Sequence, residues 1–156
     1  TTIFNGFELR AAVAPYAGGD YMHATDEKTP VTFITRYYLE KIKGLCDAHG
    51  TKLLLVTAPS PVNHTMPRHN EVQALAERLD VPYLDLNLNT EELGIDWNLD
   101  TLDGGDHLNY TGCQKATAYL QQYMQTHYAL PDRRKDARYE TWNERAAEFE
   151  KLLPQT

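Results

Sequence analysis

Apolar positions along this chain follow two alternating spacings, which predict helices that alternate with strands. The first helix is predicted to begin at Thr29-Pro30, an N-cap followed by proline in the first turn, and to end at Gly50 in a left-handed C-cap. Its apolar positions recur at helical spacing: Ile34, Tyr38, Ile42 and Leu45. The short, continuous apolar run within 52–57 then suits a buried parallel strand.

The same two patterns continue downstream. They predict a helix over about 68–79, a strand over 81–86 and a helix over about 111–127 that Asn109 or Thr111 caps. A last helix is predicted from its apolar positions, Tyr139, Trp142, Ala146, Phe149 and Leu153. Alternation of helices and strands indicates an α/β fold with a parallel sheet.

Three segments are predicted along the chain. Residues 1–30 lack sustained periodicity and are predicted to be an extended lead-in with one short strand near 3–9, while 31–128 form the α/β portion and 129–156 a C-terminal helical extension. Two strands are too few for a stable open sheet, because sheets typically have about four to six. The others come from a strand pair missed in 1–30, from a partner chain, or from the rest of a larger domain; we favour the last.

Composition excludes several classes of function. The 156-residue chain has a net charge of −7 and no basic stripe, which argues against a nucleic-acid partner. No apolar run approaches the roughly 18 residues that a membrane span needs. Two cysteines do not make a disulfide framework. No cofactor is predicted.

A glycine-loosened turn just before the third predicted helix carries a histidine and two carboxylates. His107 has the chemistry of a general base, because its ordinary pKa lies close to neutrality. A base needs a carboxylate that orients its ring, and Asp103 and Asp106 are the local candidates. Gly104 and Gly105 permit the chain to reverse, so we rank Asp103 ahead of Asp106.

The chain offers little that could serve as the nucleophile for such a base. Its only serine, Ser60, lies between Pro59 and Pro61, which restrict the backbone and remove an amide donor beside it. Asn63 is a candidate amide donor for the same pocket. Cys113 is the other candidate nucleophile, although its helical position predicts that it faces the core.

A metal site is the competing chemistry for the same turn. Asp103, Asp106 and His107 offer ligand atoms, and His64 or His69 from a neighbouring loop would complete the set. The chain has no His-x-x-x-His or Cys-x-x-Cys spacing, so no metal is predicted as the primary interpretation.

The pattern Asp-x-x-x-His-Leu-Asn-Tyr-x-Gly, which follows a Val-Pro-Tyr-Leu-Asp-Leu strand and opens a closing helix, resembles the C-terminal block of the SGNH (GDSL-like) hydrolases. The likeness covers roughly 31–128 and is closest to bacterial proteins related to alginate O-acetyltransferases and the teichoic-acid D-alanylation protein. It implies a flavodoxin-like, three-layer α/β fold of which this chain is part. It also implies a Ser-His-Asp triad in which His107 is the base and Asp103 or Asp106 the acid.

The chain also departs from that family's pattern. The family's acid usually lies three residues before the histidine, where this chain has Gly104, and its Gly-Asp-Ser and oxyanion blocks are not found here. The resemblance therefore implies that the nucleophile lies before Thr1 and that this chain alone is inactive. The implied substrate is an acylated glycan or small ester, and the implied location is the cell envelope. A non-catalytic module that binds glycan or protein, with tyrosine and tryptophan as stacking surfaces, is the alternative.

Overall fold

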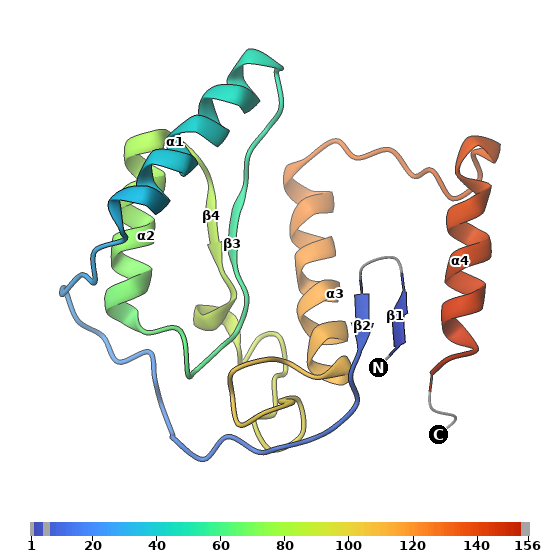
Figure 1. The fold of residues 1–156 in the computed structure, drawn as a ribbon, viewed down its shortest axis with the longest axis horizontal. Helices are drawn as coiled ribbons and strands as arrows, with labels where there is room; N and C mark the ends of the chain where they lie inside the picture. Colours follow the sequence, from blue (N-terminus) through green and yellow to red (C-terminus); the bar gives the residue numbers. More distant parts are fainter. Residues whose placement is uncertain (1, 5–6, 154–156) are drawn as a thin grey trace. The chain divides into compact units, whose positions relative to one another are not determined.

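The computed structural model describes residues 2–4 and 7–153, so the ends of the predicted lead-in and C-terminal extension lie outside the described residues. Within that range the fold is mixed α/β, as the sequence predicts (Figure 1). The elements in chain order are β1 (Thr2–Phe4), β2 (Phe7–Leu9), α1 (Phe33–Ala48), β3 (Leu55–Thr57), α2 (Met66–Leu79), β4 (Tyr83–Asp85), α3 (Tyr110–His127) and α4 (Glu140–Glu150). Short 3₁₀ turns cover Leu86–Asn89 and Ala137–Tyr139.

Strands β3 and β4 form a parallel pair, in the register Leu55 to Tyr83 and Thr57 to Asp85. The predicted parallel pairing is thereby confirmed. The described strands form one parallel and one antiparallel pair, so the three-layer, flavodoxin-like sheet stays a prediction. In the antiparallel pair, β1 and β2 make a hairpin where the sequence predicts a single short strand.

The chain divides into two compact units, Arg10–Thr117 and Thr1–Leu9 with Ala118–Thr156. This boundary differs from the expected one, because residues 10–30 belong with the α/β portion instead of forming a separate lead-in. In the unit that contains both chain ends, the rings of Phe7 and Phe149 meet edge to face at 5.7 Å. This contact packs the hairpin against α4.

The core of the Arg10–Thr117 unit lies between α2 and the parallel strands. Figure 1 shows α1 and α2 together on one side of β3 and β4. The buried apolar side chains come from α2, from β4 and from the segments that flank β4: Leu75, Ala76, Val81, Leu84, Leu86 and Leu93. Helix α2 ends at Asp80, which adopts a left-handed conformation and turns the chain directly into β4.

Helix α1 differs from its prediction at its start and on its apolar face. Its N-cap is Thr32, whose hydroxyl accepts from the Thr35 amide. The expected cap, Thr29, precedes the helix and donates its amide to the Pro67 carbonyl. The predicted apolar positions are largely exposed: Ile34 66%, Tyr38 61%, Ile42 48% and Leu45 63%. No helix in the described part of the chain is long and apolar enough to cross a bilayer.

Candidate functional site

The turn between Asp103 and His107 is closed by two contacts from one carboxylate. Asp103 Oδ2 lies 2.7 Å from His107 Nδ1, and its Oδ1 accepts from the His107 backbone amide at 2.7 Å. Gly104 and Gly105 have φ values of +76° and +100°, which reverse the chain between the two residues. The carboxylate therefore fixes both the backbone and the ring of His107.

The second carboxylate is farther from the ring and has another partner. Asp106 Oδ2 lies 3.6 Å from His107 Nδ1, beyond hydrogen-bond distance. Its Oδ1 accepts instead from the side-chain amide of Asn63. Asp103 is therefore the residue that hydrogen-bonds the imidazole, in the order that the sequence argument ranks them.

Residues 10–16, assigned to the lead-in by the sequence, hold this turn in place. Ala14 donates its amide to the Thr101 carbonyl at 3.0 Å and accepts from the Gly104 amide at 2.9 Å. The Arg10 carbonyl accepts from the Tyr110 amide at 2.8 Å, at the start of α3. This support depends on backbone pairing between distant segments, for which the sequence carries no side-chain signal.

The start of α3 positions the turn from the other side. Asn109 is 2% exposed, and its Oδ1 accepts from the Gly112 amide at 3.1 Å, so it caps the helix as predicted. Its side-chain nitrogen, Nδ2, donates to the Leu99 carbonyl at 2.7 Å. His107 thus lies two residues before Asn109, the N-cap that anchors the start of α3 in the core.

The electrostatics of the dyad follow from these contacts. The hydrogen bond that His107 donates to Asp103 raises the pKa of His107 above its ordinary value, and slight desolvation opposes this rise. Desolvation alone would raise the pKa of Asp103, but the hydrogen bonds from His107 outweigh it and lower that pKa. The side chain of His107 is 66% exposed. Because Nδ1 donates to an ionised carboxylate, Nε2 is the nitrogen left to exchange a proton with a bound group.

Ser60 and Asn63 lie against the same turn, but Ser60 has other hydrogen-bond partners than an imidazole. Its hydroxyl donates to the Asp106 carbonyl at 2.8 Å and accepts from Asn63 Nδ2 at 3.3 Å. Its amide donates to Asn87 Oδ1 at 2.8 Å. These contacts use the hydroxyl proton and the amide that a nucleophile and an oxyanion donor would need.

Cys113 lies in the first turn of α3 and is half-buried. Its thiol approaches the Leu108 carbonyl at 3.7 Å. Burial raises the pKa of this thiol, so the protonated form is favoured over the nucleophilic thiolate.

A second cluster of ionisable side chains surrounds Asp85 at the end of β4. His64 Nε2 lies 2.7 Å and His69 Nδ1 2.8 Å from Asp85 Oδ2. Burial alone would raise the pKa of Asp85, but hydrogen bonds from His64 and Asn87 hold it far below its usual range. The prediction that His64 or His69 would join the ligands at His107 is therefore corrected, because both rings bind Asp85.

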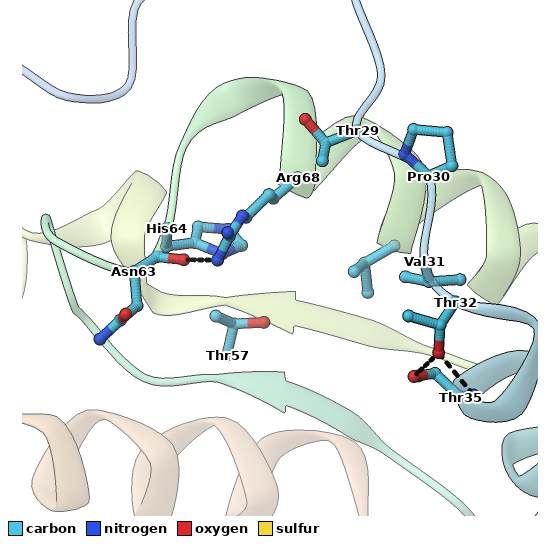
Figure 2. Close-up of a pocket in the computed structure, with 10 residues that line it drawn as sticks. Thr29, Pro30, Val31, Thr32, Thr35, Thr57, Asn63, His64 and Arg68 are labelled. Atoms are coloured by element: carbon cyan, nitrogen blue, oxygen red, sulfur yellow. Dashed lines mark hydrogen bonds between the residues drawn. The ribbon is translucent and has the colours of Figure 1, made fainter.

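This cluster was not predicted from the sequence, although the sequence carries one signal for it. Asp85 ends a buried strand, and the C-terminal ends of parallel strands are common positions for functional groups. Beside it lies a cavity of about 330 Å³, whose lining includes His64, Asn63 and Arg68 at one end and Thr32 and Thr35 at the other (Figure 2). Asn63 borders this cavity and also holds Asp106.

Comparisons with family models, with curated proteins and with solved structures found no match to this chain.

Proposed function

We propose that the chain supplies the base and the orienting acid of a serine-type esterase or O-acyltransferase acting on an O-acylated glycan or cell-envelope polymer. The observation that carries the proposal is the 2.7 Å contact between Asp103 Oδ2 and Nδ1 of an exposed His107. This is the arrangement in which a carboxylate fixes the tautomer of a general base and stabilises its imidazolium form. The same proposal includes the flavodoxin-like, three-layer fold of the SGNH hydrolases for the α/β portion of the chain.

Each half of the proposed reaction uses the same proton carrier. His107 Nε2 takes the proton of a serine hydroxyl as that oxygen attacks the ester carbonyl carbon. The imidazolium then gives this proton to the departing alkoxide, which leaves as an alcohol, while the acyl group stays on the serine oxygen as an acyl-enzyme. Water or a sugar hydroxyl then attacks the carbonyl carbon of the acyl-enzyme and gives its proton to His107 Nε2. The imidazolium returns this proton to the serine oxygen as that oxygen leaves, which regenerates the serine. Asp103 remains ionised throughout and stabilises the imidazolium.

The proposal places the nucleophilic serine outside this sequence. Ser60 is the only serine in the chain, and its hydroxyl donates to the Asp106 carbonyl instead of to an imidazole. The isolated chain is therefore expected to be inactive, since a triad that lacks one member retains only residual catalysis.

A fluorophosphonate probe, which reacts with activated serines, tests this division of labour. We expect the probe to label the full gene product at a serine outside this chain and to leave the isolated chain unlabelled. In the full gene product, His107→Ala should abolish labelling by the probe. In the same protein, Asp103→Asn should slow the turnover of p-nitrophenyl acetate by roughly 10²- to 10⁴-fold. Asp106→Asn is the matched control and should have a much smaller effect. Labelling of Ser60, or labelling that survives His107→Ala, would contradict the proposal.

The same geometry supports one other candidate, a metal site at the turn. Ligand atoms of Asp103, Asp106 and His107 lie within 4.8 Å of one another. Against it, all three side chains are at least 40% exposed. Zinc retained by the purified chain and lost in His107→Ala would favour this candidate over the base–acid dyad.

A further inference from the structure

We propose that His64, His69 and Asp85 form a binding site for a divalent transition-metal ion of the zinc class. Their ligand atoms, one from each side chain, lie within 4.8 Å of one another. Two imidazole nitrogens and one carboxylate oxygen are a common protein ligand set for such ions. The inference does not depend on the function proposed for His107.

The three ligands come from positions that packing holds in place. Asp85 is the last residue of β4, His69 lies in the first turn of α2, and His64 precedes the N-cap of that helix. Their side chains are 1%, 15% and 8% exposed, respectively. Helix α2 packs on β4, so the two histidines and the carboxylate meet without a loop having to close around an ion.

Neighbouring side chains orient the carboxylate from outside the cluster. Asp85 Oδ1 accepts from the Asn87 amide at 2.9 Å and from its side-chain nitrogen at 2.8 Å. The hydroxyl of Tyr83 lies 3.1 Å from Oδ2 and 2.8 Å from the hydroxyl of Thr57. Such outer contacts are typical of metal-binding carboxylates, because they fix which oxygen faces the ion.

The distances require a small expansion to admit an ion. Each imidazole nitrogen now lies 2.7–2.8 Å from Asp85 Oδ2, the length of a hydrogen bond. Ligands at about 2.0–2.1 Å from a tetrahedral ion stand roughly 3.3 Å apart, so each contact must open by about half an ångström. The ion would then replace the two hydrogen bonds that join these rings to Asp85.

The partners of Asp85 leave room for a cationic ligand. The carboxyl is buried, and the four side chains that hydrogen-bond it are two imidazoles, a phenol and an amide. None of these four carries a permanent positive charge. A divalent ion would add a positive charge beside this buried carboxyl group.

The cavity beside His64 provides room for a further ligand. His64 and Thr57 both line the cavity of about 330 Å³, which has the space for water to reach the site (Figure 2). Three protein ligands and one water would complete a tetrahedral shell. A site with one exchangeable position is thus expected, in contrast to a closed structural site with four protein ligands.

Metal binding by the tag-free chain tests the inference. After dialysis against Zn²⁺ and then against metal-free buffer, we expect about one equivalent to remain, and Co²⁺ to give the visible absorption of a tetrahedral site. His69→Gln keeps a hydrogen-bond donor near Asp85 and should fold, as circular dichroism would confirm, but should lose stoichiometric binding. Tyr83→Phe should weaken binding by about 10- to 100-fold. Zn²⁺ should raise the melting temperature of the unmodified chain and not that of His69→Gln.

His107→Ala is the matched control, because it removes the histidine of the other cluster. It should retain Zn²⁺ and the Co²⁺ spectrum unchanged. The inference is overturned if the unmodified chain retains no Zn²⁺, if a folded His69→Gln binds as tightly as the unmodified chain, or if His107→Ala abolishes binding.

Discussion

At the scale of single residues, His107 divides two tasks between its ring nitrogens. Nδ1 donates to Asp103 and fixes the ring, which leaves Nε2 for proton transfer. Gly104 and Gly105 make this contact possible, because a residue with a side chain at either position would have to adopt a left-handed backbone conformation. Gly105 carries a second constraint, since an added Cβ would lie 2.8 Å from both Pro61 Cγ and the ring of Tyr16.

Alanine substitutions at these two glycines separate backbone strain from steric clash. Gly104→Ala should lower the free energy of unfolding by about 1–2 kcal/mol, from the left-handed conformation alone. Its Cβ would meet only a carbonyl oxygen, at 3.9 Å. Gly105→Ala should cost more and should also displace His107 from Asp103. Urea denaturation and the NMR signals of His107 would measure both effects. Equal costs for the two variants would show that the clash is absent.

At the scale of elements, local sequence patterns predicted part of the site. Asp103 and His107 are four residues apart, so glycine content alone indicated their contact. Ser60 and Asn87 follow β3 and β4, and their hydrogen bond is a consequence of parallel pairing, which brings the two C-terminal strand ends together.

Other contacts had no local signal. His64 and His69 are five residues apart, a spacing that does not place both on one helix face, and only the packing of α2 against β4 brings them to Asp85. The first helix was expected to begin at Thr29, but Thr32 is its cap. The Thr29 amide donates to the Pro67 carbonyl, a contact with a distant segment that the helical pattern does not indicate.

Two helical glycines provide a matched test of how closely α3 packs against Asp100. An added Cβ at Gly112 would lie 2.4 Å from the Asp100 carbonyl oxygen, whereas one at Gly44 in α1 would meet nothing within 4 Å. Gly112→Ala should therefore destabilise the chain by about 1–3 kcal/mol, because the helix must move away from buried Asp100. Gly44→Ala should stabilise it by about 0.5–1 kcal/mol through helix propensity. Stabilisation by both substitutions in thermal melts would contradict this packing.

At the scale of the whole molecule, the α/β class was predictable because it depends on periodicity, while the division into units was not. Residues 10–30 have no periodic pattern, yet their backbone pairs with the turn before α3 and joins them to the Arg10–Thr117 unit. Apolar residues on α1 and Val56 on β3, which is 41% exposed, were expected to be buried and are not. Periodicity identifies an apolar face but not what covers it.

Global stability should depend on pH through Asp85. The folded-state pKa of this carboxyl lies below its unfolded value, so its contribution is present above about pH 4 and is lost as the pH falls through the folded value. Asp85→Asn should lower stability near neutral pH and flatten the acid limb of the melting temperature, measured in chelator-containing buffer. An unchanged acid limb in the variant would show that other carboxylates dominate it.

The pairing of His107 with Asp103 is the central contact of the proposed site, and ¹⁵N-resolved NMR titration of the histidine rings tests it directly. We expect neutral His107 to carry its proton on Nδ1 and to titrate above its ordinary pKa of about 6.5. Asp103→Asn should lower the pKa of His107 clearly more than Asp106→Asn does. A proton on Nε2 of the neutral ring, or equal effects of the two substitutions, would contradict the proposed base and orienting acid.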